Sequence, residues 1–378
     1  MKRMTFIFLL FSFLALGLNG CIEYTPPPPI KTSHKHFLRQ KINYTQTQHA
    51  VLLLPLTGNL ASAGSAIKEG FLLAQQQTGH PIKTDIIDTN QIKPITKAYQ
   101  EALSKGATII IGPLEKANVA SLAQNSLPVT TIALNQIPNT SNLKLYQFGF
   151  SPHDEACQVA MRAARDHHHT ALIIAPVGEW GNGVVNAFEK CWSQSNGSIK
   201  HTLRFKLQDN LADKLRETLG ISKYTTFSSF KKQAPVDMVF LAAPPAIGRQ
   251  VNPLLKFYID RHIPVYATSF IYTGTIHLHE DQDLNGILFC DIPWVLSSQS
   301  IATQLEQKDR QNFIENNRLY ALGIDAYRLT LQIKDLKASS GAYIPGVTGD
   351  LYISSGQRIL RQLTWAKFQQ GKPHIIHK

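Results

Sequence analysis

Three consecutive histidines, His167, His168 and His169, are the first residues in this sequence that invite comparison with a metal site. Three neighbouring side chains project in different directions on a helix or a strand, so they do not converge easily on one ion. Metal pairs on helices need the i, i+4 spacing, which is absent here. The pattern therefore favours a polar helix end, and we expect no metal site.

A second candidate for chemistry is the segment Gly178-Glu179-Trp180-Gly181, between a predicted strand and a predicted helix. Trp180 can stack on a sugar ring or clamp two parts of the fold, and clamping is the favoured interpretation. Glu179 can accept hydrogen bonds from a ligand amine or hydroxyl, but no partner carboxylate is placed by spacing for acid-base catalysis. Nucleophile elbows, phosphate-binding loops and His-Glu-x-x-His motifs are absent from the sequence. We expect no catalytic residues and no cofactor.

The composition excludes several classes of protein. The chain has 378 residues, of which 43% are hydrophobic and 17% are charged, so it forms a core and is neither a solvating acidic chain nor a charged coiled coil. The formal charge of +12 favours polyanionic neighbours. Because Lys and Arg are spread along the chain without interleaved aromatic residues, the excess indicates a diffuse surface field or attraction to acidic cell-wall material.

The first 21 residues predict where the protein resides. Lys2 and Arg3 precede an apolar run over 6–18, which is typical of a signal peptide and short for a membrane span. The run ends at Leu18-Asn19-Gly20-Cys21, which resembles the bacterial lipobox, in which the cysteine is acylated and becomes the new N-terminus. We therefore expect a signal peptide over 1–20 and lipidation of Cys21. The residue after the cysteine is not the Asp of inner-membrane retention, which indicates the outer membrane.

The mature chain keeps a positive charge and three more cysteines. Removal of the two basic residues in the signal peptide takes the formal charge from +12 to +10 outside the cytoplasm, where we expect no nucleic-acid partner. Cys157, Cys191 and Cys290 can form at most one disulfide, and burial as small apolar side chains is the favoured state for all three. Residues 21–47 include four consecutive prolines and predict an extended tether.

From residue 48 onward, short apolar runs alternate with amphipathic segments, which predicts an α/β fold with parallel sheets. The predicted strands cover 50–54, 82–88, 108–111, 128–134, 171–175, 236–242 and 264–267, with a last pair over 349–355 and 358–363. The predicted helices lie around 66–74, 95–104, 115–124, 154–166, 184–192, 251–258 and 312–333. The segment 148–152 breaks the rhythm and is interpreted as a crossing between two interwoven Rossmann-like lobes.

The two lobes of the region 48–378 are expected at 48–149 with 285–337, and at 150–284 with 338–378. Ligands of open parallel sheets bind beyond the carboxyl ends of the strands, so loops there nominate a cleft between the lobes. The candidate cleft residues are Thr57, Gly58, Gly112, Pro113, Asn135, Ser151, Glu179, Trp180, Pro244, Thr268, Ser269, Tyr272 and Asp325.

Eight strings in the sequence resemble the periplasmic-binding-protein-like domain of the LppC family of lipoproteins, the penicillin-binding protein activators. They cover about residues 48–370. They begin at residues 53 (LLPLTG), 111 (IGPL), 147 (QFGFSP), 175 (AP, with WG at 180), 240 (FLAAPP), 266 (YATS), 289 (FCDIPW) and 320 (YALGIDAY).

The resemblance implies a type I periplasmic-binding-protein fold and an outer-membrane lipoprotein that faces the periplasm. It also implies a partner, a bifunctional class A penicillin-binding protein, whose peptidoglycan synthesis the lipoprotein activates without being an enzyme; peptidoglycan itself is a further expected partner. Members of the family carry a helical-repeat region before this domain, where this sequence has the proline-bearing tether. The alternative hypothesis is a periplasmic solute-binding or sensing lipoprotein for an amino acid or a cell-wall fragment.

Overall fold

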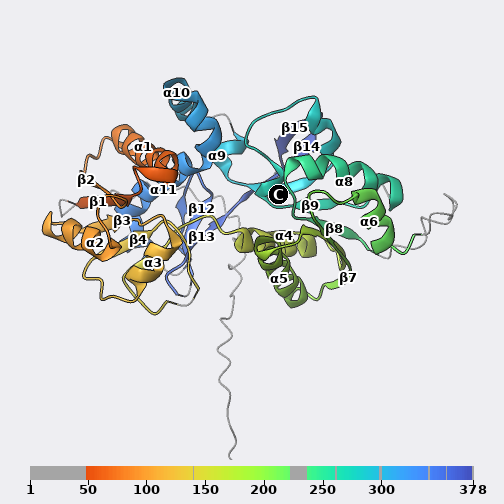
Figure 1. The fold of residues 1–378 in the computed structure, drawn as a ribbon, viewed down its shortest axis with the longest axis horizontal. Helices are drawn as coiled ribbons and strands as arrows, with labels where there is room; N and C mark the ends of the chain where they lie inside the picture. The colour runs from red at the N-terminus through yellow and green to blue at the C-terminus, as the bar shows by residue number, and fades with distance from the viewer. Residues whose placement is uncertain are drawn as a thin grey trace, which may run out of the picture. The chain divides into compact units, whose positions relative to one another are not determined.

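The computed structural model describes residues 48–376, apart from 139, 222–235, 260–261, 298–299, 339–340 and 355. The predicted signal peptide, Cys21 and the predicted tether lie outside these residues. Helices and strands alternate along the described chain, and the strands gather into separate sheets (Figure 1). Within the described residues, no helix combines the length and the apolar character that a membrane span requires.

The first part of the chain forms a five-stranded parallel sheet (Figure 1). Its strands, in spatial order, are β2 (Lys83–Asp88), β1 (His49–Leu54), β3 (Ile109–Ile111), β4 (Thr130–Ala133) and β5 (Leu145–Gln147). The connecting helices are α1 (Ala61–Thr78), α2 (Ile95–Ser104) and α3 (Lys116–Ala123). Every residue of β1 and β3 is buried, as their continuous apolar runs predict for strands covered on both faces.

A second sheet has seven strands. Its order is β15 (Lys372–Ile375), β14 (Thr364–Gln369), β10 (Leu288–Asp291), β9 (Val265–Ala267), β8 (Met238–Leu241), β6 (Thr170–Pro176) and β7 (Ser198–Phe205). Five neighbouring strands are parallel: β10, β9, β8, β6 and β7. Strands β14 and β15 extend the β10 edge in antiparallel fashion. Helices α4 (Pro152–Arg165), α5 (Glu179–Gln194), α6 (Leu211–Thr218) and α8 (Pro245–Tyr258) belong to this part of the chain.

The chain leaves the second sheet later than the sequence predicts. We expected a return to the first lobe near residue 285, but β10 pairs with β9 and β14 and so extends the second sheet. The short apolar run that forms β10 is compatible with either sheet, so hydrophobic periodicity alone cannot predict which sheet it joins. The passage comes after Asp291, through α9 (Pro293–Leu296), α10 (Ser300–Lys308) and α11 (Arg310–Ala338).

Helix α11 packs along α1 of the first lobe with two glycines at the contact. A Cβ on Gly323 would lie 2.1 Å from the carbonyl oxygen of Ile67, and one on Gly70 would lie 2.1 Å from that of Tyr320. Each glycine therefore lets the backbones of the two helices touch directly. This contact fixes α11 to the first lobe, although the chain reaches it from the second sheet.

The predicted last strand pair does not close the second lobe. Strands β12 (Asp350–Ile353) and β13 (Ile359–Gln362) form a separate antiparallel sheet with β11 (Ile344–Pro345). Arg358, just before β13, forms an isolated bridge with Gln147 at the end of β5. Which sheet a strand joins depends on residues far away in the sequence. The sequence therefore predicted these two strands but not the sheet that they form.

Helices α4 and α5 are joined by a disulfide between Cys157 and Cys191, whose Cα atoms are 5.3 Å apart. This corrects the expectation that all three cysteines are buried free thiols, which holds only for Cys290. Both helices were predicted from the sequence, but their side-by-side packing was not. Burial raises the pKa of the Cys290 thiol well above its ordinary value.

Candidate functional site

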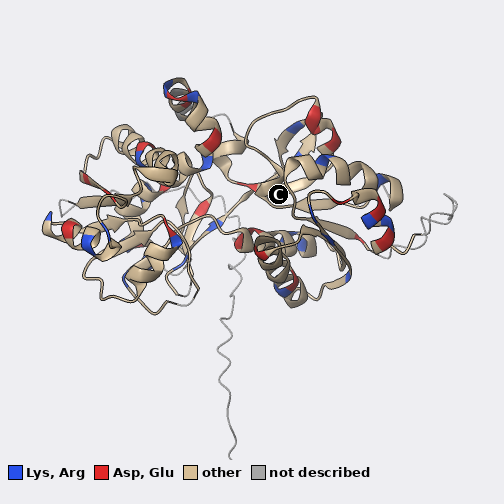
Figure 2. Ribbon diagram, in the orientation of Figure 1, with Lys and Arg blue, Asp and Glu red and all other residues tan. Residues whose placement is uncertain are grey.

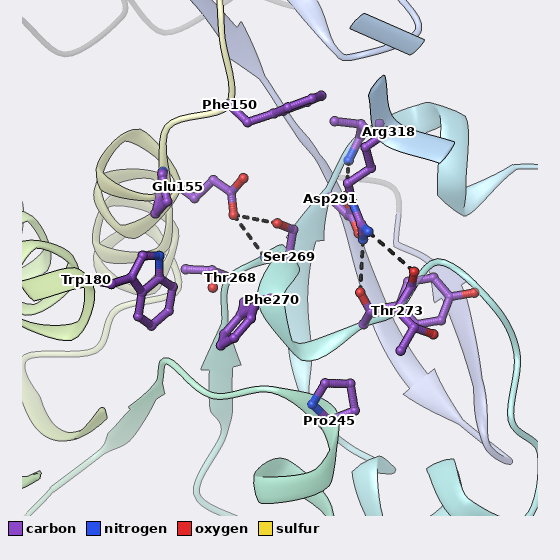
Figure 3. A pocket seen from close by; sticks show the side chains of 13 residues that line it. Phe150, Glu155, Trp180, Pro245, Thr268, Ser269, Phe270, Thr273, Asp291 and Arg318 are labelled. Carbon is purple, nitrogen blue, oxygen red and sulfur yellow. Dashed lines mark hydrogen bonds and ion pairs between the residues drawn. The ribbon is translucent and has the colours of Figure 1, made fainter. Parts of the chain in front are cut away.

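A cavity of about 380 Å³ lies where strands of the second sheet end (Figure 3). Its lining comes from the segment before α4, from the first turns of α4, α5 and α8, from the end of β10, from the segments after β9 and β10, and from one residue of α11. These are the positions at which parallel sheets place ligands. The cavity is therefore the candidate functional site.

The apolar part of the cavity is largely aromatic. Trp180, the second residue of α5, lies against Phe270 after β9, with ring centroids 4.7 Å apart. Both side chains stay partly exposed, at 37% and 44%. Phe150 lines the cavity from the segment before α4, on the side of Glu155 away from Trp180 (Figure 3). Such walls suit the apolar or ring portion of a ligand.

Glu155 places a carboxylate at the cavity from the first turn of α4. The helix begins there because Pro152 occupies its first turn and the Ser151 side chain accepts a hydrogen bond from the Asp154 amide. The Glu155 side chain is almost wholly buried, and its Oε2 accepts hydrogen bonds from the amide of Ser269 at 3.1 Å and from its hydroxyl at 2.7 Å. Burial raises the pKa of this carboxyl, although Arg361 and Ser269 oppose the effect.

A second acid at the cavity, Asp291, is neutralised by an arginine. Asp291 is the last residue of β10 and is fully buried, and Arg318 of α11 donates to both of its oxygens from Nε and Nη2. Arg318 also donates from Nη2 to the carbonyl oxygen of Tyr272 at 3.0 Å. Burial raises the pKa of Asp291, and burial together with Asp291 raises the pKa of Tyr272 to about 12.

A further buried cation, Arg361, lies against the ring of Phe150. The guanidinium carbon of Arg361, in β13, lies 4.5 Å from the centroid of the Phe150 ring. The residue is 5% exposed, and burial lowers its pKa. Phe150 lines the cavity, whereas Arg361 does not.

Thr268 contributes a hydroxyl that the described residues leave unused. It follows β9 directly, lines the cavity and is 1% exposed. Its Oγ1 is buried and has no hydrogen-bond partner among the described residues. A buried hydroxyl without a partner costs free energy, so this atom is a ready contact for a bound ligand.

Four of the predicted cleft residues line the cavity: Trp180, Thr268, Ser269 and Tyr272. Two more, Ser151 and Pro244, are the N-cap residues of α4 and α8, next to lining residues. Glu179 is exposed at the start of α5 and does not line the cavity. The predicted loops after the strands of the second sheet therefore do meet in space.

The remaining predicted cleft residues lie elsewhere. Those of the first lobe follow its strands and do not line this cavity: Thr57, Gly58, Gly112, Pro113 and Asn135. They make contacts within the first lobe. The Thr57 hydroxyl donates to Asp88 at 2.8 Å, and the Asn135 side-chain amide donates to the Leu114 carbonyl oxygen at 3.0 Å.

Asp325 corrects a prediction. It was named as a cleft residue, but it lies inside α11 and is fully buried. Its carboxylate accepts hydrogen bonds from the amides of Val347 and Thr348, at 3.0 and 2.7 Å, and pairs with Arg328 at 2.8 Å. Gly323, two residues before Asp325, is also helical and allows the close contact between α11 and α1.

The sequence did not single out the three charged residues of the cavity. Glu155 falls at the start of the helix predicted over 154–166, and Asp291 ends an apolar strand, a position that could have marked it. Arg318 carries no local signal because it lies within a helix. The three histidines bring no metal site: among the residues that the structure describes, no group of three His, Cys, Asp or Glu side chains is placed to hold an ion.

Comparisons with known proteins agree over most of the chain. A family model described as "LppC putative lipoprotein" matches residues 34–371. The penicillin-binding protein activator LpoA of Vibrio cholerae is 29% identical over 352 residues, which cover 84% of this chain and 56% of that protein. The LpoA of Photobacterium profundum is 27% identical and covers 85% of this chain. The chain spans about half the length of the curated relatives it matches, 47% and 56% for two of them.

Solved structures give the same fold. The C-domain of LpoA from Haemophilus influenzae, described as a regulator of PBP1A, matches with a TM-score of 0.74 at 26% identity, over 87% of this chain and all of that domain. A putative branched-chain amino acid ABC transporter protein from Chromobacterium violaceum matches with a TM-score of 0.65 at 25% identity, over 85% of this chain. The predicted periplasmic-binding-protein-like α/β fold is confirmed.

Proposed function

This chain belongs to the LppC family of lipoproteins, and from that premise we propose that it activates a bifunctional class A penicillin-binding protein in peptidoglycan synthesis. One observation carries the proposal: the described fold covers the whole of a solved domain, the C-domain of LpoA, described as a regulator of PBP1A, at a TM-score of 0.74. We therefore assign this role to the region that the chain shares with its longer relatives.

The proposed place of action is the periplasmic face of the outer membrane. Residues 1–20 are the proposed signal peptide, Cys21 the lipid-bearing residue and 21–47 the tether. A single acyl chain gives weak membrane binding, whereas several chains on one cysteine anchor it stably. Cys21→Ala should therefore move the protein from the membrane fraction to the soluble fraction, with Cys290→Ala as the control that keeps it in the membrane. Retention of the Cys21→Ala variant would refute the anchor.

Activation without catalysis is proposed to work by differential binding. A domain that docks better on the active form of the synthase shifts the synthase population toward that form. The tether sets the reach and the local concentration of the domain. In the described residues, basic and acidic side chains are interspersed over both lobes, so that no single element carries the positive charge (Figure 2). We propose that this diffuse field favours peptidoglycan and the partner protein.

The test is peptidoglycan synthesis in vitro by class A enzymes of the same organism, with and without the full chain in detergent. Glycan polymerisation and peptide cross-linking are measured separately, and heat-denatured chain is the control. We expect more cross-linking per enzyme when the folded chain is present. Unchanged cross-linking with every class A enzyme of the organism would refute the activator function.

A second candidate function is solute binding or sensing, for an amino acid or a cell-wall fragment. The observation that favours it is the cavity of about 380 Å³ at the ends of the second-sheet strands. Calorimetric titration with amino acids and muropeptides tests it. Saturable binding supports the second candidate, and heats no larger than those of dilution count against it.

A further inference from the structure

The charges at the cavity are unequally compensated. Asp291 is held by Arg318 through two nitrogens, and that arginine is further occupied by the carbonyl oxygens of Tyr272 and Thr273. Glu155, in contrast, is contacted only by the neutral donors of Ser269, and no Lys, Arg or His nitrogen of the described residues lies within ion-pair distance of it. Arg361, whose guanidinium carbon lies 4.5 Å from the centroid of the Phe150 ring, is the positive group that most lowers the pKa of Glu155.

The polar atoms around Glu155 can accept more hydrogen bonds than the protein supplies. Only Oε2 is contacted by Ser269, so Oε1 is left for a donor. Among the described residues, the Thr268 hydroxyl also has no hydrogen-bond partner, and it is drawn between Trp180 and Ser269 (Figure 3). An ammonium group beside these atoms has several N–H donors, which can serve both the Glu155 carboxylate and the Thr268 hydroxyl oxygen.

The surrounding walls suit a positive charge on an apolar body. Trp180 and Phe270 present adjacent aromatic rings beside these atoms, and aromatic faces attract organic cations. The lining offers a ligand carboxylate no free cationic side chain, because Arg318, its one basic residue, is already bound to Asp291 and to two backbone carbonyl groups. The charged side chains of the lining therefore favour a cation over an anion.

We propose that this cavity binds a small organic ammonium ion, with Glu155 as its counter-charge, Thr268 as a second acceptor and the Trp180–Phe270 pair as the support for its apolar part. The inference stands apart from the proposed activation of a synthase, since the cavity can bind such a molecule whether or not the protein docks on a penicillin-binding protein. If both hold, the ammonium compound is a candidate signal for the activator.

The experiment compares four probes that share a phenyl ring and differ in charge: 2-phenylethylamine, 2-phenylethanol, phenylacetate and L-phenylalanine. Each is titrated calorimetrically into the full chain in detergent. We expect saturable binding of the amine, with the alcohol weaker by about tenfold to a hundredfold, the usual effect of a hydrogen bond to a charged group. Binding of phenylacetate or L-phenylalanine as tight as that of the amine would overturn the proposal, as would absence of amine binding.

Two variants connect the binding to the cavity. Glu155→Gln should weaken amine binding by about tenfold or more and leave the alcohol unchanged, whereas the matched control Glu179→Gln, an exposed carboxylate outside the cavity, should change neither. Trp180→Ala, at a partly exposed site that folding tolerates, should weaken both amine and alcohol. Circular dichroism confirms that each variant is folded. Amine binding that persists unchanged in both Glu155→Gln and Trp180→Ala would refute the assigned site.

Discussion

Replacement of Asp325 by alanine tests whether this residue stabilises the fold, as its burial indicates, or serves a ligand. Its carboxylate accepts hydrogen bonds from the amides of Val347 and Thr348 and from the Thr348 hydroxyl, the last at 2.6 Å. These bonds hold the segment before β12 against α11. All three donors are buried, so that water cannot replace the lost oxygens.

The magnitude follows from the donors left behind. A buried donor without a partner costs about 1–3 kcal/mol, so three donors set a lower limit of about 3 kcal/mol. Loss of the ion pair with Arg328 adds little to this, because the partly exposed guanidinium can regain water. We therefore expect Asp325→Ala to lower the free energy of unfolding by about 3–5 kcal/mol.

The assay is equilibrium unfolding in urea, followed by far-UV circular dichroism. Asp335→Ala is the control, because Asp335 is an exposed carboxylate on the same helix. We expect this control to change the free energy of unfolding by no more than about 0.5 kcal/mol. A loss below about 1 kcal/mol for Asp325→Ala would refute the reasoning, and would return Asp325 to the candidate ligand residues.

Three other predictions concern the folded region. Burial raises the pKa of Glu155 above its unfolded value of 4.5, so the stability contributed by its protonated form is complete below that pH and is lost as the pH rises through the folded pKa. Urea unfolding between about pH 4 and pH 8 should therefore show Glu155→Gln gaining stability relative to the unmodified chain as the pH rises, and a relative loss would contradict the assigned cause. Gly323→Ala should destabilise by about 1–3 kcal/mol in thermal or urea unfolding, because its Cβ would lie 2.1 Å from the Ile67 carbonyl oxygen; an effect equal to that of exposed Lys334→Ala would show that the helices separate freely. Replacing both Cys157 and Cys191 by serine should cost about 3–4 kcal/mol in urea unfolding, given their separation of 34 residues, and an unchanged midpoint would count against the disulfide.

The sequence predicted strands with continuous apolar runs well and strands of mixed composition poorly. Strand β1 is a continuous apolar run that helices cover on both faces, and α2 was predicted with the bounds that the structure shows. Strand β7 was missed because it is an edge strand in which Lys200 and Thr202 alternate with less exposed residues. Strand β5 is buried but was missed because Tyr146 and Gln147 give it no continuous apolar run.

The candidate site was predictable only in outline. The rule that ligands lie beyond the ends of parallel strands led to Thr268 and Ser269, which directly follow β9. It could not rank the two sheets, and so it also named Thr57 and Gly112 of the first lobe. The pairing of Asp291 with Arg318 joins a strand end to a helix, and nothing in the local sequence around either residue specifies that meeting.

Most of the cavity lining comes from loops and first turns, with Asp291 from the end of β10 and Arg318 from α11, and neither Trp180 nor Phe270 belongs to the core that the strands form. Side chains such as Trp180 and Phe270 can change without disturbing the packing of β6, β8 or β9. Recognition and architecture can therefore diverge at different rates in descendants of one ancestor. A chain only 26% identical to a solved relative can keep its fold at a TM-score of 0.74 while acquiring a chemical preference of its own.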